Sequence, residues 1–183
     1  MLPVDLNISI LLREYPFLER FDQAARLGFE AVEFWWPAGE DLRALARRIR
    51  DTGLRVVSMN FDHGSMAAGE RGLLNFPEGE ARFRANIPVA IELAQQIGCP
   101  NLNVIAGMWR EDEAREAQLD RVCENLRRAA EAAQGAGITV LVEALNTFEA
   151  GPFIFTNTRE TLAAIDRVGA PNLKLLYDAY HMQ

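Results

Sequence analysis

The chain has 183 residues, of which 49% are apolar, and this length and composition suit one compact domain spanning residues 1–183. It carries 26 Asp and Glu residues against 19 Lys and Arg residues, which gives a formal charge of −7. A negative chain is poorly suited to neutralising phosphates, so we do not expect nucleic acid as its main partner. No apolar stretch approaches the roughly 20 residues that span a bilayer, and the first residues lack the basic segment of a signal peptide. We therefore expect a cytoplasmic protein without a membrane partner.

Short apolar segments alternate with longer amphipathic segments along the chain, which is typical of a parallel sheet built from strand–helix units. Strands are predicted at residues 5–9, 31–35, 55–60, 102–105, 139–143 and 173–177, and helices at residues 17–27, 41–51, 80–97, 113–136 and 159–168. A glycine follows each predicted helix, as expected where a left-handed residue closes a helix: Gly28, Gly53, Gly98, Gly137 and Gly169. The longest irregular stretch, residues 61–79, has the length of a lid, a binding loop or a disordered segment.

Repeated strand–helix units build either an open doubly wound sheet or a closed eight-stranded barrel. No G-x-G-x-x-G or G-x-x-x-x-G-K-[ST] motif follows the first strand, so the usual phosphate-binding reason for the open sheet is missing. Polar residues stand at or near the carboxyl ends of five predicted strands: Glu33, Asn60, Asn103, Glu143 and Asp178. In a barrel these ends meet at one mouth, where barrel enzymes have their active sites. We predict an α/β fold, a TIM-type (β/α)8 barrel of which about six units are present.

Two of these residues, Glu143 and Asp178, are candidates for a metal site. Glu143 ends the apolar segment I-T-V-L-V-E, and a buried carboxylate needs a hydrogen bond, a paired charge or a cation. Because the fifth and sixth strands are neighbours in a barrel, the two carboxylates can share one ion, and Mg²⁺ and Mn²⁺ prefer oxygen ligands. His181, three residues after Asp178, is close enough to reach a substrate beside that ion. The alternative for Glu143 is a carboxylate hydrogen-bonded to the backbone of the barrel mouth, and the alternative for Asp178 is a helix cap or a turn residue. For His181 the alternative is no role at all.

Other polar or aromatic residues at strand ends and in the long loop are candidates for substrate contacts: Glu33, Trp36 with its neighbour Trp35, Asn60, His63 and Arg71. The asparagine and the histidine can bond substrate hydroxyl groups, and the arginine can clamp a carboxylate through two parallel bonds. Core packing is the alternative for the tryptophans, and a solvated loop position is the alternative for the arginine.

Four segments resemble the hydroxypyruvate isomerases, a family of the xylose-isomerase-like barrel superfamily: A-V-E-F-W-W-P, A-A-G-E-R-G-L-L-N-F-P-E-G-E, L-V-E-A-L-N-T and L-Y-D-A-Y-H. The resemblance covers essentially the whole chain. It implies that Glu143 is a metal ligand and the catalytic carboxylate, that Asp178 is a second ligand, and that His181 binds substrate. The stretch E-A-L-N-T-F-E also resembles the ketose 3-epimerases of the superfamily, in which a glutamate at the position of Glu149 touches the sugar. Thr147 stands where that pattern has an arginine.

The resemblance further implies two metal ligands from a seventh and an eighth strand, the last being the glutamate that partners Glu143 in proton transfer. The chain ends at Gln183, after six predicted strands, whereas barrels of this type have about 250 residues. We therefore expect a truncated form. Its first and sixth strands would be open edges, which invite self-association, so a homo-oligomer is one expected outcome.

The resemblance implies a metal-assisted conversion of hydroxypyruvate to 2-hydroxy-3-oxopropanoate, in which a carboxylate moves a proton between adjacent carbons through an enediolate. The partner would be a small hydroxy-carbonyl acid or sugar, and the ion Mg²⁺ or Mn²⁺. One alternative is a ketose 3-epimerase or a four-carbon sugar-acid isomerase of the same superfamily. A catalytically inactive barrel fragment is another. An abasic-site endonuclease would need a basic groove and several histidines, whereas this chain has two.

Overall fold

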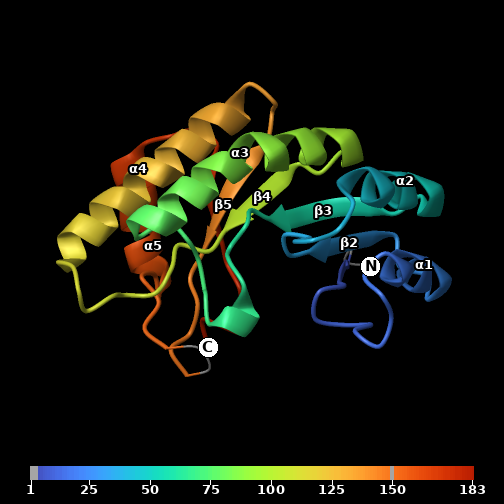
Figure 1. Ribbon diagram of the computed structural model, residues 1–183, viewed down its shortest axis with the longest axis horizontal. Helices are drawn as coiled ribbons and strands as arrows, with labels where there is room; N and C mark the ends of the chain where they lie inside the picture. The colour runs from blue at the N-terminus through green and yellow to red at the C-terminus, as the bar shows by residue number, and fades with distance from the viewer. Residues whose placement is uncertain (1–3, 149–150) are drawn as a thin grey trace.

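The computed structural model describes residues 4–148 and 151–183, in which strands and helices alternate as predicted (Figure 1). The strands are β1 (Leu6–Asn7), β2 (Ala31–Phe34), β3 (Arg55–Asn60), β4 (Asn101–Val104), β5 (Thr139–Glu143) and β6 (Leu173–Leu176). The helices are α1 (Glu19–Arg26), α2 (Leu42–Thr52), α3 (Pro77–Ile97), α4 (Arg115–Gln134) and α5 (Thr158–Val168), with a short 3-10 helix η1 (Met66–Ala68). Every bound lies within three residues of its predicted position.

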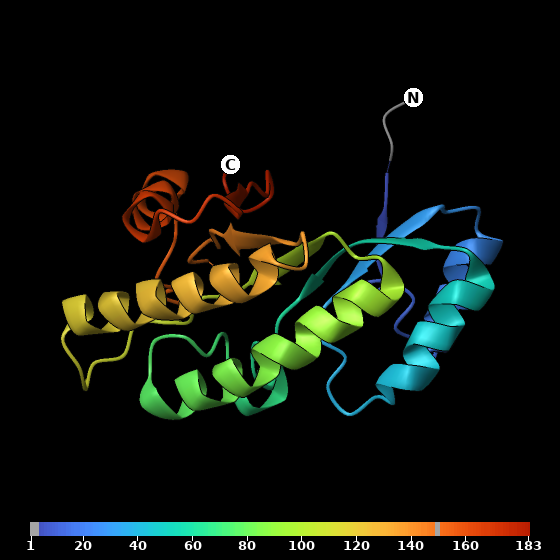
Figure 2. The same cartoon turned by 90° about the horizontal axis from the view of Figure 1, so that it is seen from above.

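The six strands form one parallel sheet in their order along the chain, from β1 to β6. Figure 2 shows this sheet curving, with α2, α3 and α4 along its outer side. A doubly wound sheet would reverse its strand order at a switch point and carry helices on both faces. Consecutive parallel strands with helices outside are the arrangement of a (β/α)8 barrel, so the predicted fold class is confirmed for the six units in this chain.

The hydrophobic core lies between the sheet and the outer helices. Fully buried side chains from both layers pack there, including Leu45 of α2, Leu93 of α3, Leu126 of α4, Leu102 of β4 and Val140 of β5. Burying a side chain of this size contributes about 1.5–3 kcal/mol, so this core fixes the positions of the strand ends. Among the helices of the described residues, none has the length and apolar composition needed to cross a membrane.

Helix ends follow the sequence signals. Asp41 caps α2 by accepting hydrogen bonds from the backbone N–H groups of Arg43 and Ala44 at 2.9 and 3.2 Å. Asn157 caps α5 through the N–H of Glu160 at 3.0 Å. The five predicted glycines all have positive φ, which confirms their place at the ends of helices.

The predicted start of the third helix at Glu80 was wrong, because α3 begins at Pro77. A proline in the first helical turn needs no intrahelical N–H bond, and its fixed φ favours that position. The irregular segment after β3 is therefore residues 61–76.

The segment from residue 61 to residue 76 is anchored at both ends and exposed in its middle. The N–H of Gly72 donates to the carbonyl of His63 at 2.8 Å, and the N–H of Leu74 donates to the carbonyl of Ala106 at 3.1 Å. Leu74 is fully buried, whereas residues 65–69 are exposed. This segment is thus a short exposed tip on a fixed base, which suits a lid or a binding loop.

Candidate active site

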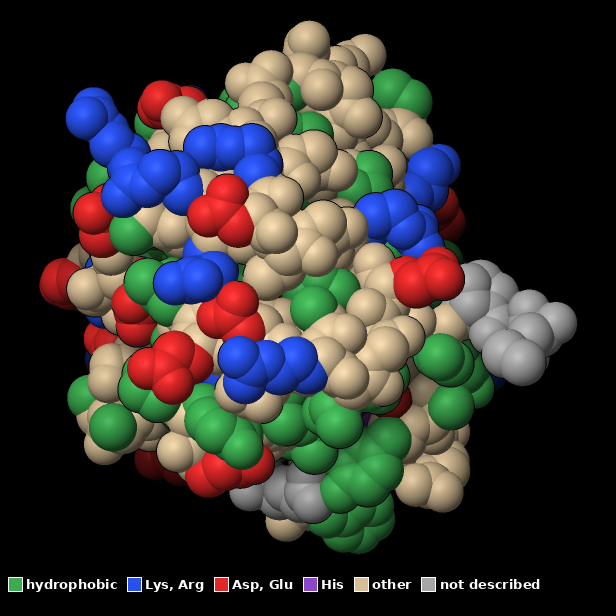
Figure 3. All heavy atoms as spheres, turned by 90° about the vertical axis from the view of Figure 1, so that its right-hand side faces the viewer, with side chains coloured by type: hydrophobic (Ala, Val, Ile, Leu, Met, Phe, Trp, Pro, Cys, Tyr) green, Lys and Arg blue, Asp and Glu red, His purple; other side chains and the backbone are tan. Residues whose placement is uncertain are grey.

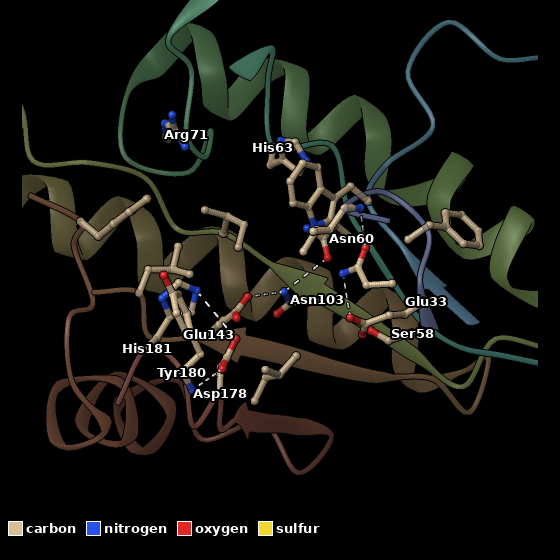
Figure 4. Close-up of a pocket in the computed structure, with 18 of the residues that line it drawn as sticks. Glu33, Ser58, Asn60, His63, Arg71, Asn103, Glu143, Asp178, Tyr180 and His181 are labelled. Atoms are coloured by element: carbon tan, nitrogen blue, oxygen red, sulfur yellow. Dashed lines mark hydrogen bonds and ion pairs between the residues drawn. The ribbon is translucent and has the colours of Figure 1, made fainter. Parts of the chain in front are cut away.

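A cavity of about 670 Å³ lies at the carboxyl ends of the strands (Figure 4). Seven of the nine residues predicted for the site line it: Glu33, Asn60, His63, Arg71, Glu143, Asp178 and His181. Residues from all six strands or from the segments after them contribute to the lining. Parallel strands in consecutive order bring their carboxyl ends together, so residues 148 positions apart in the sequence, such as Glu33 and His181, share one cavity.

The two other predicted residues do not appear in this lining. Trp36 is partly buried against the hydrophobic core, and its neighbour Trp35 lines the cavity in its place. Trp35 directly follows the end of β2 and lines the cavity together with Glu33 and Phe34, whereas Trp36 packs against the core. The structure thus assigns the aromatic wall to Trp35 rather than to Trp36. Glu149 lies outside the described residues.

Glu143, Asp178 and His181 form the chemical centre of the cavity. Glu143 pairs with Leu176 in the β5–β6 register, which brings the end of β5 beside the segment that carries Asp178 and His181. Each of the three offers a potential ligand atom, and these atoms lie within 4.8 Å of one another. The donor set of two carboxylates fits a hard divalent cation such as Mg²⁺ or Mn²⁺.

The hydrogen bonds of His181 favour a donor role for this residue over a ligand role. Its Nδ1 accepts the backbone N–H of Asn146 at 3.4 Å and lies 2.8 Å from the amide Nδ2 of the same residue. A neutral imidazole that accepts at Nδ1 carries its proton on Nε2. That Nε2 lies 3.7 Å from Oδ2 of Asp178. In this tautomer His181 can donate to a carboxylate or to a substrate oxygen.

Glu143 has the most perturbed carboxyl group of the cavity. Burial raises its pKa to about 7, and the nearby carboxylates of Asp178 and Glu33 act in the same direction. A hydrogen bond from Nδ2 of Asn103 to Oε2 of Glu143, at 3.0 Å, opposes this rise. A carboxyl group with a pKa near neutrality can both accept and release a proton. A bound cation would favour its ionised form.

Glu33 is a third carboxylate on this cavity. Burial raises its pKa above the usual range, while Nδ2 of Asn7 donates to its Oε1 at 2.8 Å. The charge of Asp178 raises the pKa of both Glu33 and Glu143, and the charge of Glu33 acts in the same direction on Glu143. Three carboxylates around one space attract a cation.

Arg71 is the one Lys or Arg side chain in the lining, and it comes from the segment after η1. Figure 4 shows it on the loop drawn above Glu143 and His181. Within the part of the chain that the structure describes, Arg71 forms no ion pair, whereas Arg82 nearby is bound by Asp62 and Glu70. A guanidinium without a carboxylate partner beside a cavity is suited to an anionic substrate group.

His63 forms part of the wall next to Trp35, with the two rings edge to face and their centroids 5.8 Å apart. Burial lowers the pKa of His63 below its usual value, so the ring is neutral at neutral pH. A neutral imidazole both donates and accepts hydrogen bonds, which suits contact with a substrate hydroxyl group.

Sequence reasoning missed several residues of the lining, among them Asn7 and Ser58. Asn7 is the last residue of β1, and Glu33 is the last but one of β2. The search for polar residues at the carboxyl ends of strands, which found Glu33, therefore applies to Asn7 as well. Ser58 stands two residues before Asn60 on the same side of β3. The sequence placed Asn103 among the polar residues at strand ends, but it predicted no role for this residue.

The raised pKa of Glu143 predicts a pH-dependent stability of the metal-free protein. Between the ordinary pKa of 4.5 and the folded value of about 7, the folded chain holds a proton that the unfolded chain has lost. The free energy of unfolding therefore falls as the pH rises through this window. Glu143→Gln cannot ionise, so the variant should become more stable than the wild type above pH 7, by at most about 3–4 kcal/mol for a pKa rise from 4.5 to about 7 at 1.4 kcal/mol per pKa unit.

Urea unfolding in the presence of a chelator at pH 4.5, 6, 7 and 8 measures this difference. Glu111→Gln, the same substitution at an exposed position outside the cavity, is the control. A stability difference between Glu143→Gln and the wild type that stays constant from pH 4.5 to pH 8 would contradict the expectation.

Comparison with known proteins agrees with the fold. An acidic cavity at the carboxyl ends of consecutive parallel strands defines a protein of the TIM-barrel class. A family model described as "Xylose isomerase-like TIM barrel" matches residues 21–183, and the chain belongs to this family. Its resemblance to the hydroxypyruvate isomerases is confirmed by the following relatives.

The chain is 38% identical to the hydroxypyruvate isomerase of Escherichia coli (strain K12) over 183 residues, which are 100% of this chain and 71% of that protein. It is 40% identical to the 2-oxo-tetronate isomerase of Cupriavidus necator over 177 residues, which cover 97% of this chain and 68% of the relative. The crystal structure of an AP endonuclease of family 2 from Brucella melitensis superposes with a TM-score of 0.93 at 37% identity, over 100% of this chain and 70% of that one.

Proposed function

We propose that the chain is a metal-assisted isomerase that interconverts hydroxypyruvate and 2-hydroxy-3-oxopropanoate. The observation that carries this proposal is the pairing of Glu143 and Asp178, two carboxylates that can share one cation, in a cavity whose lining has Arg71 as its one Lys or Arg side chain. The substrate has the matching groups, a carboxylate for the arginine and an oxygen-rich carbon pair for the cation. The names of the relatives at 38% and 40% identity support an isomerase of a small hydroxy-keto acid.

Different residues of the cavity have different roles in this reaction. Arg71 binds the substrate carboxylate and sets which end of the molecule faces Glu143. Mg²⁺ or Mn²⁺, held by Glu143 and Asp178, would polarise the substrate carbonyl and stabilise negative charge on its oxygen. Glu143 is one of the carboxylates that move the proton, which leaves C3 of hydroxypyruvate and is returned to C2. The electron pair of the broken C–H bond becomes part of an enediolate, which His181 and Asn60 can stabilise by hydrogen bonds.

The loop of residues 61–76 completes the site by covering it. Met66 from its tip and Arg71 from its return line the cavity. An enediolate is protected when water is excluded, and an exposed tip on a fixed base can open for substrate and close over it. Substrate binding at Arg71 thus favours the closed arrangement.

Isomerisation of a four-carbon sugar acid and epimerisation of a ketose are the alternative reactions. A four-carbon sugar-acid isomerase or a ketose 3-epimerase would use the same centre, and Ser58, Asn60 and Glu33 offer polar groups for additional hydroxyls. The 40% identity to a 2-oxo-tetronate isomerase supports the four-carbon acid more directly than the epimerase.

An endonuclease is disfavoured despite the name of the Brucella melitensis protein. Its substrate would bring several phosphates, whereas one Arg and two His side chains are the basic groups of this cavity and the chain has a charge of −7. Figure 3 shows the face that carries α1 and α2, on which basic and acidic side chains are interspersed rather than gathered by sign.

The experiment is an assay of the purified chain with Mg²⁺ or Mn²⁺ on hydroxypyruvate, 2-oxo-tetronate, a free ketohexose and a duplex with an abasic site. We expect conversion of hydroxypyruvate, its loss on treatment with a chelator, and its return when the ion is added back. Preference for the four-carbon acid or the ketose would replace the named substrate, and cleavage of the duplex would replace the reaction class. A folded protein that binds the ion and converts none of these compounds would be an inactive barrel fragment.

We propose a single-domain protein of the cytoplasm that acts on a small acid, has neither a nucleic acid nor a membrane as partner, and can form a homo-oligomer.

A further inference from the structure

Asn103 lies in the middle of the polar groups of the cavity, on the central strand of three. It belongs to β4, next to Asn60 in the β3–β4 register and beside β5, which carries Glu143. Only 2% of Asn103 is exposed. Its Nδ2 donates to Oε2 of Glu143 at 3.0 Å and to Oδ1 of Asn60 at 3.3 Å, so both amide hydrogens are engaged (Figure 4).

The other end of the same amide group is poorly satisfied. Oδ1 of Asn103 is buried and has no hydrogen-bond partner among the residues that the structure describes. An unsatisfied buried acceptor costs about 1–3 kcal/mol, and such groups in native proteins call for an explanation. Rotating the amide by half a turn would place Oδ1 against the carboxylate of Glu143, where both atoms are acceptors. The side chain of Asn103 is therefore oriented to donate to Glu143, and this orientation leaves its own Oδ1 without a hydrogen bond among the described residues.

This contact fixes one oxygen of Glu143. Oε2 is held by Asn103, and the carboxyl group also interacts with Asp178, the other candidate ligand. A carboxylate fixed through one oxygen keeps its other oxygen in a defined direction. Less side-chain conformational entropy is then lost when a cation binds. Replacing a residue that orients a metal ligand in this way commonly lowers the metal affinity by about 10–100-fold.

We propose that Asn103 is a positioning residue that holds Glu143 by one carboxylate oxygen and leaves the other available to the divalent cation. The inference rests on the proposed function, because it takes Glu143 and Asp178 as the ligands. It does not depend on which hydroxy acid the enzyme converts.

The test is the affinity for Mn²⁺, measured by calorimetry or by the electron paramagnetic resonance of the free ion. Asn103→Leu has a similar size and no donor, and it should bind Mn²⁺ at least about tenfold more weakly than the wild type. Asn103→Thr suits a strand and has a shorter side chain, so it tests the same loss if the leucine variant does not fold. Far-UV circular dichroism and urea unfolding verify that each variant is folded.

Asn125→Leu is the matched control for a buried asparagine with a structural role. Asn125 is fully buried in α4, donates to the carbonyl of Leu74 at 3.0 Å and accepts from Nε of Arg84 at 2.8 Å, but it does not line the cavity. Its replacement should lower stability and leave the Mn²⁺ affinity unchanged.

Unchanged Mn²⁺ affinity in both folded Asn103 variants would overturn the inference, and so would an equal loss in Asn125→Leu. A wild-type chain without Mn²⁺ affinity would remove the proposed metal site and this inference with it. Turnover is not part of the measurement, so a failure of the isomerase reaction and a failure of the positioning role give different results.

Discussion

Glu143→Gln is expected to lower the turnover of hydroxypyruvate by about 10²–10⁴-fold, the range that one general acid–base group contributes. Glutamine preserves the shape of the side chain, and its carbonyl oxygen can still accept the hydrogen bond from Asn103. It cannot take up a proton, and a neutral amide is a weaker ligand than a carboxylate for Mg²⁺ or Mn²⁺. The loss should therefore appear in kcat while the fold is retained.

The measurement is kcat at rising Mn²⁺ concentrations, which separates the two roles of Glu143. If the ligand role alone were affected, saturation with Mn²⁺ would restore the wild-type rate; the proton-transfer role predicts that the rate stays low. Glu92→Gln, on the exposed face of α3, is the matched control and should keep wild-type activity. A Glu143→Gln variant with wild-type kcat at saturating Mn²⁺ would show that another group moves the proton.

Most of the fold was predictable because its signals are local. Apolar segments of strand length and glycines after each helix depend on neighbours in the sequence, and the structure has those elements within three residues of the predicted bounds. The start of α3 was missed because Gly79 was interpreted as part of a loop. In the structure Gly79 is buried within α3, where a Cβ atom would lie 2.5 Å from the carbonyl oxygen of Leu73. Packing selects glycine at this position, and packing between distant segments is not visible in a local pattern.

The candidate site was predictable to the extent that it follows from strand ends. One rule, a polar residue where a parallel strand ends, found Glu33, Asn60, Glu143 and Asp178, and consecutive strand order brought them to one cavity. Both tryptophans follow the end of β2, where strand alternation no longer decides which of them lines the cavity, and a register shift beside Glu33 makes the direction of the chain there harder to predict from sequence. The bond from Asn103 to Glu143 depends on the distance between side chains on neighbouring strands, which composition and spacing do not encode.

Gly72→Ala is expected to be the most destabilising of these substitutions, lowering the free energy of unfolding by more than about 3 kcal/mol, which is the range of backbone strain combined with overpacking. Gly72 has φ of +105°, a conformation that alanine rarely adopts. An added Cβ atom would lie 2.4 Å from the backbone N of Gly107 and 2.5 Å from the carbonyl oxygen of Ile105. Both atoms belong to the segment that follows β4, so relief of the contact requires that segment or the base of the lid to move.

Gly69→Ala separates the steric contact from the backbone strain. Gly69 lies in the same loop with φ of +80°, and a Cβ atom there would have nothing within 4 Å. Its replacement should cost only the left-handed conformation, about 1–2 kcal/mol. Urea unfolding of both variants and the wild type measures how far each substitution lowers the free energy of unfolding. Equal decreases would show that the close approach to Gly107 does not contribute to the destabilisation. A larger loss in Gly72→Ala, with a raised KM for hydroxypyruvate, would show that the fixed base of this loop places Arg71 over the cavity.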